Sequence, residues 1–198
     1  EGYTPEKQGR VKYAKFFLFS TKEGLPFEVK YLTAADELVF YGNANSFQYS
    51  LSTGDYITEL TQLRRLSMVA YGLTELPESF ANLKNLEFLD LGSNNFQKIP
   101  DILTPENFPK LHVLTMAANQ RHNIYDLSNT VKTNFGGLFD EEVFPRRMLE
   151  WNNLDTLVLS VNYLQGSLPE MDDWEKYTEE DIIAADTLPR ALIGTPKV

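Results

Sequence analysis

The sequence predicts an α/β solenoid, a stack of similar units that each contribute one short strand to a parallel sheet. Two adjacent stretches support this prediction, because they carry one pattern of apolar residues at a constant offset. The first has Leu63, Leu66, Met68, Leu73, Leu76 and Pro77, and the second has Leu86, Leu89, Leu91, Phe96, Ile99 and Pro100. Leucines at alternate positions are typical of a strand with one buried face. One such unit cannot bury its own apolar face, so neighbouring units must stack on it.

The spacing L-x-x-L-x-L-x-x-N-x-L in the second stretch resembles the leucine-rich repeat family. This resemblance implies a right-handed solenoid, with short parallel strands on the concave face and irregular, 3-10 or helical segments on the convex side. Asn94 stands where the chain turns out of the strand. Its side chain can bond backbone groups that would otherwise be buried unpaired, at about 1–3 kcal/mol each.

The pattern extends along the chain and predicts about five repeats with insertions. A degenerate repeat starts at Ala35, and later repeats start at Leu111 and Leu154. Strands are therefore expected near residues 38–40, 66–68, 89–91, 114–116 and 157–159. The β-prone run at residues 11–20 is expected to form a strand that caps the open end of the stack.

The same pattern divides the chain into three parts. Residues 1–34 form an N-terminal capping strand and lead-in, and residues 35–169 form the repeats, with an insertion near 128–150. Residues 170–198 form a second insertion and the lead-in to a further repeat, so the chain is expected to stop inside a longer array.

Composition narrows the range of partners. The chain has 18 Lys and Arg residues against 28 Asp and Glu residues, a net charge of −10. This charge repels phosphate backbones and anionic lipid surfaces, so nucleic acid is not an expected partner. Since no long apolar run is present, insertion into a membrane is not expected either.

The chain has no cysteine and no N-x-Ser/Thr sequon. It therefore lacks the disulfide-bonded caps of many eukaryotic extracellular leucine-rich repeat proteins, and a bacterial origin is favoured. Within that class the sequence resembles repeat proteins of gut Bacteroidetes, which are usually exported or tethered to the cell surface. The resemblance implies an exported or surface location.

Residues with catalytic or metal-binding chemistry do not form a motif. His112 and His122 are the only histidines, and the repeat places one at a strand start and the other in a loop. Acidic clusters such as Asp140-Glu141-Glu142 lack the spacing of a calcium loop. Gly136-Gly137 lacks the lysine of a phosphate loop and fits a hinge. We therefore expect no catalytic residue, no metal and no cofactor, and the protein is not expected to be an enzyme.

The candidate binding residues lie between the core leucines, on the face expected to be concave. This face is predicted to be largely apolar, with Phe88 and Val113 side by side and exposed. An alternative left open by the sequence is that an insertion covers the face. The candidate ligand-binding residues are Tyr41, Arg65, Phe88, Asp90, Val113 and Thr115.

These observations favour a non-catalytic recognition module that binds a protein or a glycan through the concave face and the insertions. Two other interpretations stay open. The chain could be the repeat domain of a larger bacterial effector or enzyme, such as a ubiquitin ligase, whose catalytic domain lies elsewhere. It could also be a structural spacer that displays another domain.

Overall fold

The computed structural model describes residues 11–18, 25, 27–42, 55–96, 98–119, 123–125, 131–134, 146–148, 151–160 and 162. Several sequence predictions fall outside these residues. They concern His122, the paired glycines at 136–137, most of the insertion near 128–150, and residues 170–198 with the expected lead-in to a further repeat.

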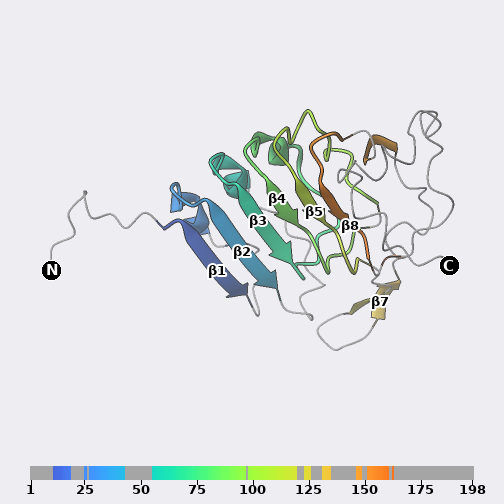
Figure 1. Ribbon diagram of the computed structural model, residues 1–198. Coiled ribbons are helices and arrows are strands. Elements are labelled where there is room, and N and C mark those ends of the chain that lie inside the picture. The colour runs from blue at the N-terminus through green and yellow to red at the C-terminus, as the bar shows by residue number, and fades with distance from the viewer. Residues whose placement is uncertain are drawn as a thin grey trace, which may run out of the picture.

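Six strands form one parallel sheet in the order β1-β2-β3-β4-β5-β8 (Figure 1). The strands are β1 (Tyr13–Leu18), β2 (Glu37–Gly42), β3 (Arg65–Val69), β4 (Phe88–Asp90), β5 (Val113–Thr115) and β8 (Thr156–Val158). The five strands expected in the repeats are all present, and the run at residues 11–20 supplies the sixth, β1, at the edge beside β2.

Each repeat strand begins one residue earlier than the sequence indicated. Backbone pairing starts before the first core leucine, because the amide of Arg65 donates to the Asp36 carbonyl at 3.0 Å and the amide of Phe88 donates to the Arg64 carbonyl at 3.1 Å. Strands β4, β5 and β8 also end before the second core residue, where the chain already turns.

Each of the five repeat strands contributes one central leucine to the core, and these leucines lie in cross-strand register. These central leucines are at most 3% exposed, so this face of the sheet is buried across β2, β3, β4, β5 and β8. They are Leu38, Leu66, Leu89, Leu114 and Leu157. The alternation read from the sequence therefore identified the buried face correctly.

Short 3-10 helices precede strands β2, β3, β4 and β8 and contribute apolar side chains to the core. They are η2 (Phe27–Tyr31), η3 (Asp55–Glu59), η4 (Glu78–Asn82) and η5 (Arg146–Met148). Pro77, whose φ of −68° suits entry into a helical turn, stands directly before η4. The rings of Phe80 in η4 and Phe108 in the next unit pack at a centroid distance of 6.3 Å. These contacts hold successive return segments together behind the sheet.

Buried and partly buried asparagines stabilise the turns that follow the strands. Asn94 accepts hydrogen bonds from the amides of Tyr71 and Leu73 at 2.9 and 3.2 Å, and its Nδ2 donates to the carbonyls of Met68 and Leu91, both at 2.8 Å. Asn119 and Asn162 occupy the equivalent positions in later repeats and also bond backbone groups. The inward role expected for Asn94 is confirmed.

A two-stranded antiparallel sheet, formed by β6 (Asn123–Tyr125) and β7 (Val131–Asn134), interrupts the array between β5 and β8. Because β5 pairs directly with β8, none of the described residues between these two strands forms a strand of the parallel sheet. This antiparallel pair begins before residue 128, where the insertion was expected to start. The domain boundaries drawn from the sequence stay predictions.

Candidate binding face

The outer face of the sheet, defined as the face opposite the core leucines, presents two continuous rows of side chains. The first row consists of Tyr13, Glu37, Arg65, Phe88, Val113 and Thr156, and the second of Lys15, Val39, Ser67, Asp90, Thr115 and Val158. Side chains directly opposite one another on paired strands are near enough to interact. Five of the six candidate residues therefore lie together, on β3, β4 and β5.

Phe88 is the centre of the first row. The register places it beside Arg65 on one side and Val113 on the other, as expected. The guanidinium carbon of Arg65 lies 4.2 Å from the centroid of the Phe88 ring. Phe88 and Val113 are consequently half-buried and not exposed, which corrects the expectation from the sequence. The reason is that cross-strand neighbours on a continuous sheet cover one another.

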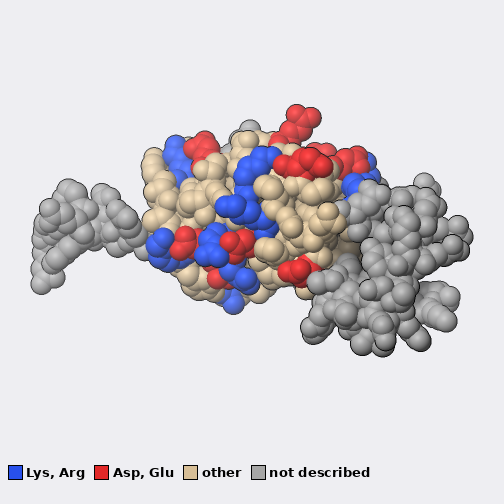
Figure 2. Space-filling model, turned by 45° about the horizontal axis from the view of Figure 1, so that its top comes forward, with Lys and Arg blue, Asp and Glu red and all other residues tan. Residues whose placement is uncertain are grey.

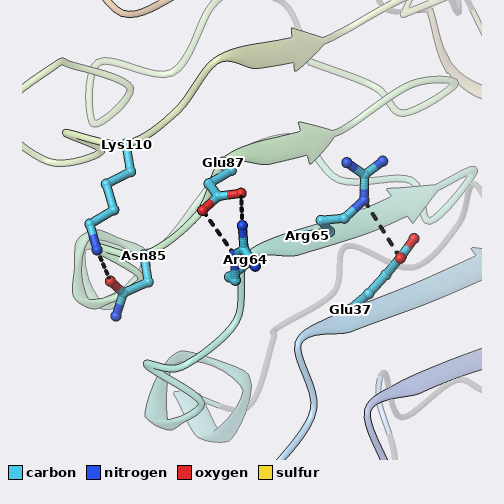
Figure 3. A network of polar contacts seen from close by, with 6 residues as sticks. All are labelled: Glu37, Arg64, Arg65, Asn85, Glu87 and Lys110. Atoms are coloured by element: carbon cyan, nitrogen blue, oxygen red, sulfur yellow. Dashed lines mark hydrogen bonds and ion pairs between the residues drawn. The ribbon is translucent and has the colours of Figure 1, made fainter.

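Arg65 is held in place from the opposite side by Glu37, with Nε 3.5 Å from Oε2 (Figure 3). Its sequence neighbour Arg64 turns away to Glu87, which it meets with two hydrogen bonds of 2.8 and 2.7 Å. Two consecutive arginines therefore serve different surfaces, because successive residues near a strand point to opposite faces.

Asp90 and Thr115 are paired in the second row, one step along the strands from Phe88 and Val113. Oδ1 of Asp90 accepts the amide hydrogen of Gly92 at 2.9 Å. Burial raises the pKa of the Asp90 carboxyl, and the Gly92 hydrogen bond opposes this effect only in part. A Cβ at Gly92 would lie 3.1 Å from Oδ1, so the glycine leaves room for this contact.

Tyr41 does not join the other candidates. It stands at the far end of β2, in register with Phe17 and Val69. Its ring stacks on that of Phe17 at 5.4 Å, and Nζ of Lys15 lies 4.8 Å from the Tyr41 centroid. Sequence analysis missed Phe17 and Lys15 as members of the face. The signal was available, since Tyr13, Lys15 and Phe17 alternate as the outer residues of the repeats do.

A second feature missed from the sequence is a row in which basic and acidic residue types alternate, one residue before the first row. We call it the charge ladder; its members are Lys12, Asp36, Arg64, Glu87, His112 and Asp155. Its members contact one another in pairs, Lys12–Asp36 at 3.1 Å, Arg64–Glu87 at 2.7 Å and His112–Asp155 at 3.1 Å. Hydrogen bonding to Arg64 lowers the pKa of Glu87. The sequence does contain a signal for the charge ladder, because a charged residue or a histidine stands two positions before the central leucine of each repeat strand.

The charge ladder lies at the exposed edge where the strands begin, and its pairs are partly open to solvent. On the side of the molecule that Figure 2 shows, basic and acidic side chains lie next to one another and do not form one large patch of a single sign. Exposed pairs of this kind contribute little to stability individually. They disfavour strand registers that would bring like charges together.

The described part of the chain contains no group of three His, Asp or Glu side chains placed to hold a metal ion. His112 lies directly before β5, as expected, and its Nδ1 contacts Asp155. Within the same residues, no helix combines the length and the apolar character needed to cross a membrane.

No protein-family model matches the sequence, and no curated protein matches it. The structure is similar to the plant peptide hormone receptor RGFR1, solved in complex with RGF2, with a TM-score of 0.50 and 21% identity over 80% of this chain and 24% of the receptor chain.

Two bacterial structures are also similar. A leucine-rich repeat protein of Leptospira interrogans has a TM-score of 0.49 and 25% identity over 74% of this chain and 29% of that protein. An internalin of Listeria monocytogenes has a TM-score of 0.48 and 18% identity over 72% and 34%. The chain spans about a quarter to a third of the length of these proteins.

The parallel sheet with one strand per unit, the central leucines and the asparagine turns define a leucine-rich repeat solenoid. The likeness to the receptor supports the same fold. The fold class expected from the sequence is confirmed.

Proposed function

We propose that this chain is a non-catalytic recognition module that binds a protein or a glycan through the outer face of its sheet. The observation that carries the proposal is the cluster of Arg65, Phe88 and Val113 in one row, with Asp90 and Thr115 in the next. It combines a planar cation, an aromatic ring and polar groups on a rigid sheet. Aromatic and arginine side chains dominate the energetics of binding sites.

The cluster is preorganised, which favours binding. Arg65 is held between Glu37 and the ring of Phe88, and Asp90 is held by the Gly92 amide. A ligand that meets side chains already in place loses less conformational entropy on association than one that must order them. The sheet itself is held by the core leucines beneath it.

The proposal extends to the setting in which the module acts. We infer a bacterial protein that is exported or held at the cell surface, on the basis of the resemblance to gut Bacteroidetes repeat proteins. The insertions, including the region of β6 and β7, would extend the binding surface beyond the sheet.

The test begins with a pull-down and a glycan array that use the parent chain. Any ligand obtained is then measured against Phe88→Ala and Arg65→Ala, each confirmed as folded by circular dichroism. We expect both variants to weaken binding at least tenfold. Tyr31→Ala is the matched control, because Tyr31 is an exposed aromatic residue of η2 and lies away from the outer face.

Binding within twofold of the parent in both variants would contradict the proposal and would direct attention to residues 170–198. If the chain binds no ligand and only holds a fused domain at a fixed distance, the interpretation as a structural spacer is favoured. Activity that requires a catalytic domain from the same gene would favour the larger effector or enzyme.

A further inference from the structure

Asp90 lies in the middle of the outer face, between two hydroxyl residues. The register places Ser67 of β3 on one side of it and Thr115 of β5 on the other. Ser67 is buried, and Asp90 and Thr115 are half-buried. Oδ1 of Asp90 accepts the Gly92 amide hydrogen, and within the described residues no hydrogen bond to Oδ2 is formed. Asp90 is thus a carboxylate set into the face among short polar side chains.

Asp90 differs from every other charged side chain described on the strands of the parallel sheet or directly before them. Each of the others has an oppositely charged side chain, a histidine or an aromatic ring as its partner, and the histidine, His112 beside Asp155, is a countercharge only when protonated. The pairs are Lys12–Asp36, Glu37–Arg65, Arg64–Glu87 and His112–Asp155, and Lys15 lies over the rings of Phe17 and Tyr41. Within the described residues no cation pairs with Asp90, whose partial burial raises its pKa without an opposing positive charge.

The nearest cation on the outer face is directed elsewhere. Arg65 stands on the adjacent strand, one step along the rows from Asp90. Its guanidinium is held over Phe88 and beside Glu37, as Figure 3 shows for the latter contact. A carboxylate removed from water without a countercharge lies in an unfavourable environment. A positive group brought by a ligand would relieve that penalty.

We propose that Asp90, flanked by Ser67 and Thr115, receives the ammonium or guanidinium group of a basic side chain in an extended protein segment that binds the outer face. The inference rests on the proposed function and names the class of ligand. Phe88 and Val113, one step along the strands, offer apolar surface to the aliphatic stem of that side chain. The net charge of −10 would draw a basic segment toward the chain.

The size of the face favours a segment over a globular partner. Six strands spaced by about 4.8 Å, with two rows of outer side chains, offer on the order of 300 Å². Stable complexes between folded proteins bury about 800 Å² on each side. A single extended segment fits the smaller area. A glycan could donate hydroxyl hydrogens to Asp90 but would leave its charge uncompensated, so it is the less favoured ligand.

The test uses an array of synthetic nine-residue peptides as the probe. Each peptide is present in three versions that differ only in the central residue, which is arginine, its neutral isostere citrulline, or glutamate. The labelled parent chain, Asp90→Asn and Asp155→Asn are applied to identical arrays. Asp155→Asn is the matched control, because it removes one negative charge of the charge ladder, away from the outer face.

We expect the parent to bind a subset of arginine peptides at least tenfold more strongly than their citrulline versions. Asp90→Asn should bind both versions within twofold of each other, and Asp155→Asn should keep the parent's preference. The assignment is overturned if no preference exists, if Asp90→Asn retains it, or if Asp155→Asn loses it equally.

The outcomes also separate this inference from the proposed function. Peptides bound without a basic preference, with binding lost in Phe88→Ala, would overturn the role of Asp90 and support the face as a binding site. If the parent chain binds no peptide but binds a glycan through Phe88, the inference that the ligand is a protein segment is overturned. The proposed function is then retained. Peptide binding that is insensitive to both Phe88→Ala and Asp90→Asn would overturn both.

Discussion

The guanidinium carbon of Arg65 lies 4.2 Å from the centroid of the Phe88 ring, while Nε of the same side chain contacts Glu37. One residue thus links three neighbouring strands, β2, β3 and β4. This contact explains why the ring of Phe88 is partly covered in a face that could otherwise expose it. It also gives Arg65 a fixed position, which lysine would not reproduce, because only the planar guanidinium can stack and bond in this way.

The contact predicts a measurable coupling between Arg65 and Phe88. In a double-mutant cycle of Arg65→Ala and Phe88→Ala, we expect a coupling free energy of about 0.5–1 kcal/mol in urea denaturation. The control cycle pairs Phe88→Ala with Lys98→Ala. Lys98 is bonded to Asp101 and not to the outer face, so the two effects should add. Equal coupling in both cycles would show that the ring and the guanidinium do not interact.

Leu89→Ala tests the register of the whole stack. Leu89 is fully buried between Leu66 and Leu114, and its truncation should lower the free energy of unfolding by roughly 2–5 kcal/mol through loss of buried surface and a residual cavity. His112→Ala, an exposed substitution before the next strand, should change it by less than about 0.5 kcal/mol. A similarly small value for Leu89→Ala would place this residue outside the core.

Asn94→Ala tests the turn that follows β4. The substitution removes the partners of two buried amides and of the Met68 and Leu91 carbonyls. We expect the free energy of unfolding to fall by about 2–4 kcal/mol. Asn85→Ala is the matched control, because its hydrogen bonds, to the Thr61 carbonyl and from Lys110, are exposed and water can replace them. If the two variants lose equal stability, the burial of the Asn94 bonds has no energetic consequence.

The fold was predictable because its determinants are local and repeated. Leu89 and Leu114 follow from alternation along a strand, and Asn94 from the need of a buried turn for hydrogen bonds. For the candidate face, the sequence predicted which residues point outward. The partial burial of Phe88 was not, because it depends on how Arg65 is oriented across two strands.

Features that depend on the pairing of distant strands escaped the sequence analysis. The charge ladder becomes visible only when the lead-in residues of successive strands are aligned, and an insertion separates His112 from Asp155 in the sequence. The early start of that insertion, at β6, also has no apolar period to mark it. Another departure from the pattern is at Tyr71. It occupies the position that Asn94 has in the next repeat, so this repeat has a tyrosine in place of the turn asparagine.

Tyr71→Phe tests that departure. Tyr71 is buried, its ring meets the edge of Phe40 at 6.4 Å, and its hydroxyl has no hydrogen-bond partner among the described residues. Burial raises the pKa of that hydroxyl. Since an unpaired buried hydroxyl is unfavourable, its removal should leave the free energy of unfolding unchanged or raise it. Tyr71→Ala, which also removes the ring, should lower it by roughly 3–5 kcal/mol. A loss above about 1 kcal/mol in Tyr71→Phe would reveal a hydroxyl partner.

Asp90→Asn should stabilise the free protein at neutral pH. Burial raises the pKa of Asp90, so the folded state binds the proton more tightly than the unfolded chain does, and the ionised side chain is unfavourable above the folded pKa. Asparagine stays neutral and keeps an oxygen for the Gly92 amide. The gain in the free energy of unfolding, measured in urea, should be present at pH 7 and shrink as the pH falls through the raised pKa of Asp90.

Glu87→Gln provides a comparison, because its effect on the free energy of unfolding should have the opposite sign to that of Asp90→Asn. Hydrogen bonding to Arg64 lowers the pKa of Glu87, so its ionised form stabilises the folded state above the unfolded pKa, and this contribution is lost as the pH falls through the folded pKa. Glu87→Gln should therefore lower stability at pH 7 and approach the parent in acid. If Asp90→Asn followed the same course as Glu87→Gln, Asp90 would have a positive partner within the chain, and a basic ligand would have no uncompensated charge to meet.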